Sequence, residues 1–221
     1  MIRCFITDCS PLEDPKLYAR AYSLLSDERK EKADFYVFGK DRRLSAVAGL
    51  YIRLLERSYG KVYADEHGKL HSPGIEFNLS HSGHYVAFAC SVDPVGIDIE
   101  EIGQNMDIAR KVMTVQEYED FIGSVDEKDR EDVFARMWTA KESYMKALGL
   151  GFRLPPETFR VLYGYDIKNP AESISIYELE APQGYHVSAC SPDTSACMEP
   201  MGADRLMSAD SIEQLFCHID H

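Results

Sequence analysis

Three acidic side chains in two short segments of the sequence have types and spacings suited to binding a metal ion. Asp98 and Glu100 lie in residues 95–100, where apolar residues alternate with Gly96, Asp98 and Glu100 as they do in a β-strand. Side chains two residues apart share one face of a strand, with their Cα atoms about 7 Å apart. Two carboxylates on one face repel each other unless a cation lies between them. Oxygen ligands favour Mg²⁺ over zinc, and Gly96 leaves room for a ligand to approach.

The third acid, Glu142, lies in residues 138–146, which read Trp-Thr-Ala-Lys-Glu-Ser-Tyr-Met-Lys. Glu142 and Lys146 are four residues apart and share one face of a helix. Together with Asp98 and Glu100 they could bind a phosphate ester through a metal ion and an ammonium group. The alternative is two solvated acids on a strand and an ordinary surface salt bridge, which is the more common outcome for either pair alone.

Lys141 falls in line with the apolar residues of the same predicted helix. A lysine in such a stripe either extends its ammonium to solvent or pairs with a buried partner.

Two further segments contain residues that could bind phosphate. The turn 78–82, Asn-Leu-Ser-His-Ser, offers hydroxyls, an imidazole and backbone N–H groups, although most such turns are only turns. Residues 29–43 contain six basic side chains, but acids alternate with them, so a solvated helix of mixed charge is an equally good interpretation. The six are Arg29, Lys30, Lys32, Lys40, Arg42 and Arg43.

Periodicity predicts an α+β protein. Strands are expected near 2–7, 75–79, 84–92, 95–100, 158–165, 173–180 and 184–191, and helices from 15 to 25, after Ser26, and near 44–55, 106–113, 115–122, 129–148 and 208–218. Segments 85–91 and 185–191 share Tyr, Ala, Cys and Ser in register. This repeat predicts two pseudo-duplicated α+β halves, residues 1–93 and 94–221, with an active site in the cleft between them.

Composition narrows the function classes. The formal net charge of −13 over 221 residues argues against broad binding to nucleic acid or anionic membranes. No apolar run approaches the roughly 20 residues that span a bilayer, and the first residues lack a signal-peptide pattern, so a cytoplasmic protein is expected. The six cysteines are scattered, which argues against a disulfide framework or a zinc site.

The motifs Asn78–Ser82, 96–100 and 138–146, in this order, resemble those of the 4′-phosphopantetheinyl transferases of the surfactin-synthetase-activator (Sfp) type. The resemblance extends over nearly the whole chain. It implies two duplicated halves and a Mg²⁺-dependent transferase. Such an enzyme moves the 4′-phosphopantetheine arm of coenzyme A onto a serine of an apo acyl or peptidyl carrier protein and releases adenosine 3′,5′-bisphosphate. It also implies a monomer.

The resemblance carries site roles to matching positions of this chain. Asp98, Glu100 and Glu142 would be the Mg²⁺ ligands, with Glu142 and Lys146 as catalytic residues. The residues expected to bind coenzyme A are Arg29, Lys32, Arg43, Lys69, Ser80, His81 and Lys146, with Ser45 as a further contact. Carrier proteins of this family are typically acidic, as is this chain, so the carrier is expected to dock on an apolar patch in residues 105–125, much of which must also be ordinary core. A coenzyme-A-binding module without activity and a Mg²⁺ phosphoesterase are the alternatives.

Overall fold

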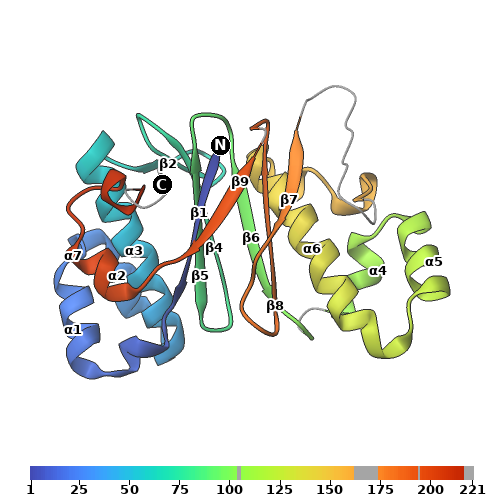
Figure 1. The fold of residues 1–221 in the computed structure, drawn as a ribbon, viewed down its shortest axis with the longest axis horizontal. Coiled ribbons are helices and arrows are strands. Elements are labelled where there is room, and N and C mark those ends of the chain that lie inside the picture. Colours follow the sequence, from blue (N-terminus) through green and yellow to red (C-terminus); the bar gives the residue numbers. More distant parts are fainter. Residues whose placement is uncertain (104–105, 162–173, 194, 217–221) are drawn as a thin grey trace.

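The computed structural model describes residues 1–103, 106–161, 174–193 and 195–216. Two β-sheets lie side by side in the middle of the molecule, and helices cover the outer flank of each (Figure 1). The mixture of helices and sheets confirms the α+β class. The helices are α1 (Pro15–Ser23), α2 (Asp27–Phe35), α3 (Gly39–Tyr59), α4 (Ala109–Val112), α5 (Val115–Ser124), α6 (Arg130–Ala147) and α7 (Ala203–Ser208).

Apart from β9, the two sheets share one strand order, with the last strand of each repeated unit in the middle. The first has the order β4-β5-β1-β9 and the second β6-β8-β7, so that in each half the first strand pairs antiparallel with the last strand of the repeat. The strands are β1 (Ile2–Asp8), β2 (Tyr63–Ala64), β3 (Leu70–His71), β4 (Glu76–Ser82), β5 (Tyr85–Ser91), β6 (Gly96–Glu101), β7 (Ser175–Leu179), β8 (Tyr185–Ser191) and β9 (Ala196–Pro200). Strands β2 and β3 form a separate pair.

The repeated segments also share their register. Tyr85 lies opposite Asp8 at one end of the β1–β5 ladder, and Tyr185 lies opposite Glu101 at the same end of the β6–β8 ladder. At the other end, Cys90 and Cys190 face Arg3 and Gly96. This common topology is what a duplication requires, although the duplication itself stays a prediction.

Local signals position the helices as expected. The Ser26 side chain accepts a hydrogen bond from the Arg29 N–H at the start of α2. Thr114 and Glu117 form a reciprocal capping box at the start of α5. Helix α3 ends at Gly60, whose φ of 96° lies in the region that favours glycine. The helices therefore begin and end where short-range hydrogen bonding favours it.

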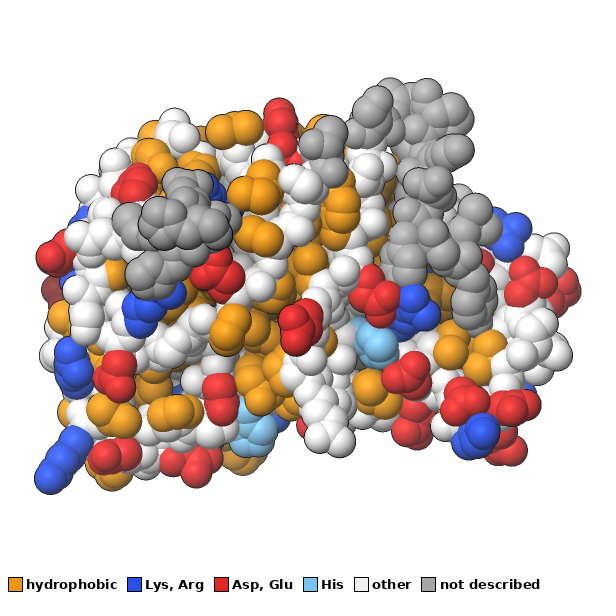
Figure 2. Space-filling view, viewed as in Figure 1, with side chains coloured by type: hydrophobic (Ala, Val, Ile, Leu, Met, Phe, Trp, Pro, Cys, Tyr) orange, Lys and Arg blue, Asp and Glu red, His pale blue; other side chains and the backbone are white. Residues whose placement is uncertain are grey.

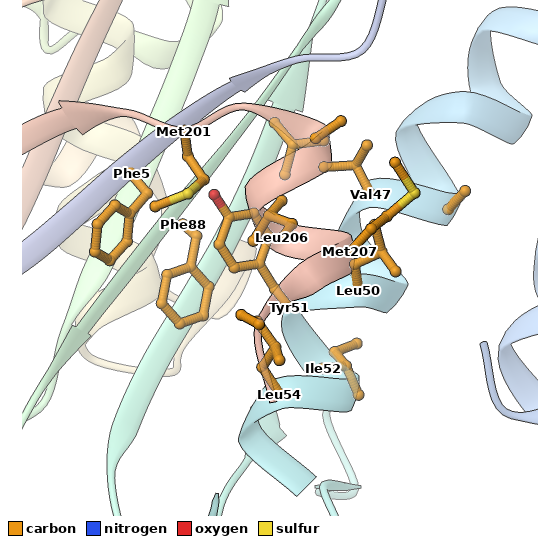
Figure 3. Packing of buried hydrophobic residues seen from close by; sticks show 14 of the residues in the cluster. Phe5, Val47, Leu50, Tyr51, Ile52, Leu54, Phe88, Met201, Leu206 and Met207 are labelled. Carbon is orange, nitrogen blue, oxygen red and sulfur yellow. The ribbon is translucent and has the colours of Figure 1, made fainter. Parts of the chain in front are cut away.

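The end of the described chain returns to the first half. Strand β9 pairs in parallel with β1, and Met201, Leu206 and Met207 pack into the core that α3 forms with the first sheet (Figure 3). Within this core, the rings of Tyr51 and Phe88 stack 4.5 Å apart. The division at residues 93 and 94 stays a prediction, but residues 196–216 contact the sheet and helices of the first half.

Three predicted elements differ from the structure. The terminal helix over 208–218 is wrong in its described part, because α7 ends at Ser208 and Glu213–Phe216 is a 3₁₀ turn; residues 217 and 218 lie outside the described residues. The helix near 106–113 is a 3₁₀ turn followed by the short α4. The described part of the predicted strand 158–165 is not a strand. Pro156–Thr158 is a 3₁₀ turn, and the buried side chains of Lys141 and Glu117 form hydrogen bonds with the backbone of Pro156 and Val161. Residues 162–165 lie outside the described residues.

No helix in the described part of the chain combines the length and the apolar character needed to cross a membrane.

Candidate functional site

The polar side chains of β4 join the first sheet to β6. Asn78 Oδ1 accepts a hydrogen bond from the Ile97 N–H at 3.0 Å, and Ser82 Oγ accepts one from the Glu101 N–H at 3.1 Å. The motif at 78–82 therefore forms much of its strand rather than a free turn, and it places Ser80 beside β6. The seam between the sheets is held by directional bonds, which fixes the relative height of β4 and β6.

Gly96 lets α6 lie directly on β6. A Cβ atom at this position would be 2.0 Å from the Ser143 carbonyl oxygen and 2.4 Å from the Ala147 nitrogen. The expectation that Gly96 leaves room for a ligand is therefore wrong, because the backbone of α6 occupies that space. The close packing brings Glu142 and Lys146 over the face of β6 that carries Asp98.

Lys146, Asp98 and Ser80 form the centre of the site. Lys146 Nζ lies 2.6 Å from Asp98 Oδ1 and 3.0 Å from Ser80 Oγ, and the Ser80 hydroxyl donates to the same Asp98 oxygen at 2.7 Å. Glu142, the partner expected from spacing, is farther away, with its Oε2 at 4.0 Å from Lys146 Nζ. Burial opposes the charge of Lys146, but the carboxylates of Asp98 and Glu142 outweigh it and raise the pKa of the ammonium.

The oxygen donors of Asp98, Glu100 and Glu142 are of the kind that a hard cation prefers. Asp98 is buried, and its Oδ2 has no hydrogen-bond partner among the described residues. Buried polar oxygens are rarely left unpaired, so this atom faces a position where a ligand would satisfy it. In the described part of the chain, no three metal-ligating side chains lie close enough together to hold an ion. The cation that contacts Asp98 is instead the ammonium of Lys146.

The pKa values of Glu100 and Glu142 are raised because these acids are buried close to one another. Burial, together with the charge of Asp98, raises the pKa of Glu100 from 4.5 to about 7, and burial raises that of Glu142 to about 7 although Lys146 opposes the rise. Both side chains would ionise more readily beside an added cation. Ser82 Oγ donates to Glu100 Oε2 at 3.3 Å, which orients that carboxylate.

The raised pKa of Glu142 predicts a stability effect with a defined sign. Below its ordinary pKa of 4.5 the carboxyl is protonated in both states. As the pH rises from 4.5 to about 7 the unfolded chain releases the proton while the folded protein keeps it, so stability falls. We expect Glu142→Gln to raise the free energy of unfolding of the ligand-free protein by about 2 kcal/mol at pH 8 and by little at pH 4.

Urea unfolding at the two pH values measures this difference, with exposed Glu119→Gln as the matched control. Equal stabilisation at pH 4 and pH 8 would contradict the electrostatic origin.

Four of the residues predicted to contact coenzyme A line a small cavity beside the central cluster. Arg29, Lys32, Ser45 and His81 all line a cavity of about 150 Å³. The guanidinium of Arg29 donates to the Ser45 carbonyl at 3.0 Å. The buried Ser45 Oγ and Arg29 Nε have no hydrogen-bond partner among the described residues, so both offer a donor to a bound anion. Tyr36 and Asp41 also line this cavity, and nothing in their local sequence pattern indicated it.

A larger cavity of about 720 Å³ lies on the other side of Leu70 and Leu79, which line both cavities. Its described lining includes the cations Lys69, Lys146 and Arg153 and no Asp or Glu. The segment Gly149–Arg153 closes one side, and sequence reasoning missed it. The two glycines at 149 and 151 are a helix stop by pattern, and only the fold shows that they turn this segment over the cavity.

Two predicted ligand contacts have protein partners in the structure. Lys69 Nζ donates to the carbonyls of Lys146 and Ala147 at 3.1 and 3.2 Å, where an ammonium also complements the dipole at the end of α6. Arg43 pairs with Glu13 at 3.0 Å and is not among the described residues that line either cavity. Their roles in binding coenzyme A stay predictions.

The proposed carrier patch at 105–125 is mainly core. Val112, Met113 and Phe121 are buried in the cluster around α6, and the exposed apolar side chains in this segment are Val115 and Ile122. Acidic side chains gather over the α4 and α5 end of the face seen in Figure 2. Amphipathic helices place their apolar residues inward, so most of the apolar side chains in this segment form core, as expected, and docking of the carrier here stays a prediction.

Comparison with known proteins gives one consistent result. Residues 94–190 match the family model described as the 4′-phosphopantetheinyl transferase superfamily. The chain is 33% identical over 193 residues to 4′-phosphopantetheinyl transferase gsp of Aneurinibacillus migulanus, covering 76% of this chain and 77% of that protein. It is 30% identical to the transferases ffp of Bacillus subtilis and Sfp of Bacillus subtilis strain 168, over 190 and 188 residues, in each case covering 77% of this chain and 84% of the relative.

Proposed function

Since this chain belongs to the 4′-phosphopantetheinyl transferase superfamily, we propose that it transfers the 4′-phosphopantetheine arm of coenzyme A to a serine of an apo carrier protein. The products would be the holo-carrier and adenosine 3′,5′-bisphosphate. Lys146 and the acids of β6 would act on the pyrophosphate, and the basic cavity would bind the phosphate at the other end of the nucleotide.

The observation that carries this proposal is the distribution of charge around the two neighbouring cavities, which share Leu70 and Leu79 in their linings. A chain with a net charge of −13 places the cations Lys69, Lys146 and Arg153 around the larger cavity, and the cations Arg29 and Lys32, with one acid, Asp41, around the smaller one. Apolar side chains line both between the cations. Such a surface suits a ligand with several phosphates and an apolar portion, which is the chemical character of coenzyme A.

The unpartnered Asp98 oxygen and the raised pKa values of Glu100 and Glu142 fit a divalent cation, and these three residues would hold Mg²⁺. When bound, such an ion supplies positive charge to the pyrophosphate. Lys146 adds a second positive group, and its contact with Asp98 keeps the ammonium charged and directed at the site.

Glu142 is the proposed base for the carrier serine. The pKa of about 7 belongs to the site without a metal ion, so this assignment rests on position: the Glu142 carboxylate lies on the face of α6 that packs over Asp98, with its Oε2 4.0 Å from Lys146 Nζ. Phosphoryl-type transfer depends mostly on positioning and charge neutralisation, so the hydroxyl needs only to lose its proton as the bond to phosphorus forms. Glu142→Gln with near-normal turnover would contradict this assignment.

Mass spectrometry of an apo-carrier protein tests the function directly. The protein is incubated with coenzyme A, Mg²⁺ and the carrier, and the expected result is a carrier heavier by one phosphopantetheine arm. A carrier with its acceptor serine replaced by alanine should gain nothing. Release of free phosphopantetheine without carrier modification would instead support a phosphoesterase, and binding of coenzyme A without either product would support a non-catalytic module.

The small cavity predicts a selective effect on substrate binding. We expect Lys32→Met to raise KM for coenzyme A about tenfold, because the cavity loses one of the cations that would bind the 3′-phosphate, a loss typical of a charged hydrogen bond. KM for 3′-dephospho-coenzyme A should change little, since that substrate lacks the phosphate. Steady-state kinetics with both substrates measures the difference, with Lys30→Met as a control on the same helix. An equal rise for both substrates would place the phosphate elsewhere.

A further inference from the structure

A fully buried lysine connects α6 to two other parts of the second half. Lys141 Nζ donates to Glu117 Oε2 at 2.9 Å, to the Pro156 carbonyl at 2.8 Å and to the Phe159 carbonyl at 2.6 Å. Its side chain has no exposed surface. An ammonium has three protons, and each is therefore matched by one acceptor. The sequence pattern showed only a lysine in an apolar stripe.

Glu117 completes the connection with both of its oxygens. Oε1 accepts from the Val161 N–H at 2.6 Å, and Oε2 accepts from the Thr114 N–H at 2.9 Å in addition to Lys141. The residue is 5% exposed. One buried pair thus ties the first turn of α5, the middle of α6 and the segment 156–161 to one another.

Stability alone does not account for this pair. Removing two charges from water to form a buried ion pair is energetically unfavourable. Apolar residues of similar volume can therefore often replace such a pair without lowering the free energy of unfolding. Position 141 lies among apolar side chains of the cluster around α6, so a methionine or leucine would suit the packing. What an apolar residue lacks is direction, because hydrogen bonds require particular angles and dispersion contacts do not.

The pair and Gly96 hold α6 from different sides. On one side the backbone of α6 packs on Gly96 without space for a methyl group. Lys141 directly precedes Glu142 in α6 and lies about 100° away from it around the helix axis. Lys146 lies a little more than one turn after Glu142. Any rotation or sliding of α6 that breaks the Lys141 bonds would also move Glu142 and Lys146 relative to Asp98.

We propose that Lys141 and Glu117 are positioning residues for phosphopantetheine transfer, which hold α6 at the rotation where Glu142 and Lys146 meet Asp98. The inference rests on the proposed function. The described lining of the small basic cavity comes from α2, α3, β3, β4 and Tyr36, which directly follows α2, and contains no residue of α6. Lys146 of α6 lines the larger cavity, so one coenzyme A contact would move with the helix while those of the small cavity would not. Loss of the pair should therefore lower kcat by a much larger factor than it weakens the binding of coenzyme A.

The test is Lys141→Met, measured by carrier modification and by calorimetric titration with coenzyme A. We expect kcat to fall about tenfold to a hundredfold, the cost of a small misplacement of catalytic groups, while Kd for coenzyme A stays within about twofold of the wild type. Val112→Ala, a buried apolar truncation in the same cluster, is the matched control and should lower the melting temperature without lowering kcat of the folded enzyme.

Exchanging the two charges separates positioning from simple charge pairing. The double variant Lys141→Glu with Glu117→Lys keeps an ion pair, but it turns a carboxylate toward two carbonyls and an ammonium toward two N–H groups. We expect no recovery of kcat, and recovery to the wild-type value would overturn the inference. If these variants do not fold, Glu117→Gln provides a milder change, for which a smaller fall in kcat at unchanged Kd is expected.

The outcomes distinguish this inference from the proposed function. A wild-type protein that modifies no carrier contradicts the function, and the positioning role with it. A wild type that modifies the carrier while Lys141→Met and Glu117→Gln keep its kcat contradicts the positioning role alone. A parallel rise in Kd and fall in kcat would also contradict it, because a general loss of structure would then explain both.

Discussion

Asp98→Asn is expected to lower kcat for carrier modification by about a hundredfold or more, in the range seen when one preorganised charged or polar group is lost from an active site. Asparagine has the same shape and can still accept the hydrogen bond from Ser80, so the fold should be retained. It removes the negative charge that holds Lys146 at 2.6 Å, and it replaces the unpartnered Oδ2 that would bind a cation. Positioning of the ammonium and binding of the metal would both be lost.

Glu101→Gln is the matched control for this variant. Glu101 follows on the same strand but projects from the opposite face, away from Asp98 and Glu100. It should keep wild-type kcat. Circular dichroism and melting temperature check that Asp98→Asn is folded. A folded Asp98→Asn protein with wild-type kcat would place the chemistry outside the cluster of Lys146, Asp98 and Ser80.

Gly96→Ala is expected to have the second large effect, on both stability and activity. The added methyl group would meet backbone atoms of Ser143 and Ala147 at 2.0 and 2.4 Å, and backbone cannot move aside as a flexible side chain can. Helix α6 must shift, at a cost of about 1–3 kcal/mol in the free energy of unfolding, as is typical of overpacked cores. Because α6 carries Glu142 and Lys146, kcat should fall about a hundredfold even where the protein remains folded.

Gly123→Ala provides the contrast for urea unfolding and carrier-modification assays. Gly123 lies in α5, and a Cβ atom there would have no neighbour within 4 Å. Alanine favours helix over glycine, so this variant should be more stable by about 0.5–1 kcal/mol with unchanged kcat. A Gly96→Ala protein with wild-type stability and kcat would show that α6 does not depend on close contact with β6.

Short-range pattern was sufficient for most of the helices and strands. The alternation in β6, the apolar stripe of α3 and the caps at Ser26 and Thr114 act within a few residues, so they can be seen without a fold. The elements that differ from prediction depend on distant partners. The segment 156–161 lacks a strand because Lys141 and Glu117 bind its backbone groups, and β9 exists because β1 offers a free edge about 190 residues earlier in the chain.

The spacing of residues in the sequence did not predict which groups the lysine side chains contact. The spacing of Glu142 and Lys146 predicts a helical pair, but the ammonium lies closer to Asp98, 48 residues away, because α6 packs on β6 at Gly96. Lys69 is predicted to bind coenzyme A, and its spacing does not show that its ammonium also contacts the last carbonyls of α6. Long side chains choose partners from whatever the fold places within a few ångströms, and strand or helix periodicity does not contain that information.

The sequence by itself determined the residue types and local geometry of the site: two acids on one face of a strand, an acid and a lysine on one face of a helix, and a Ser-His segment that precedes both. The tertiary structure alone decided how they meet. It brings Lys146 to Asp98 and Ser80, gathers Arg29, Lys32, Ser45 and His81 around one cavity, and buries Lys141 against Glu117. The physical reason is that periodicity acts over a few residues, whereas burial and charge pairing depend on distances across the fold.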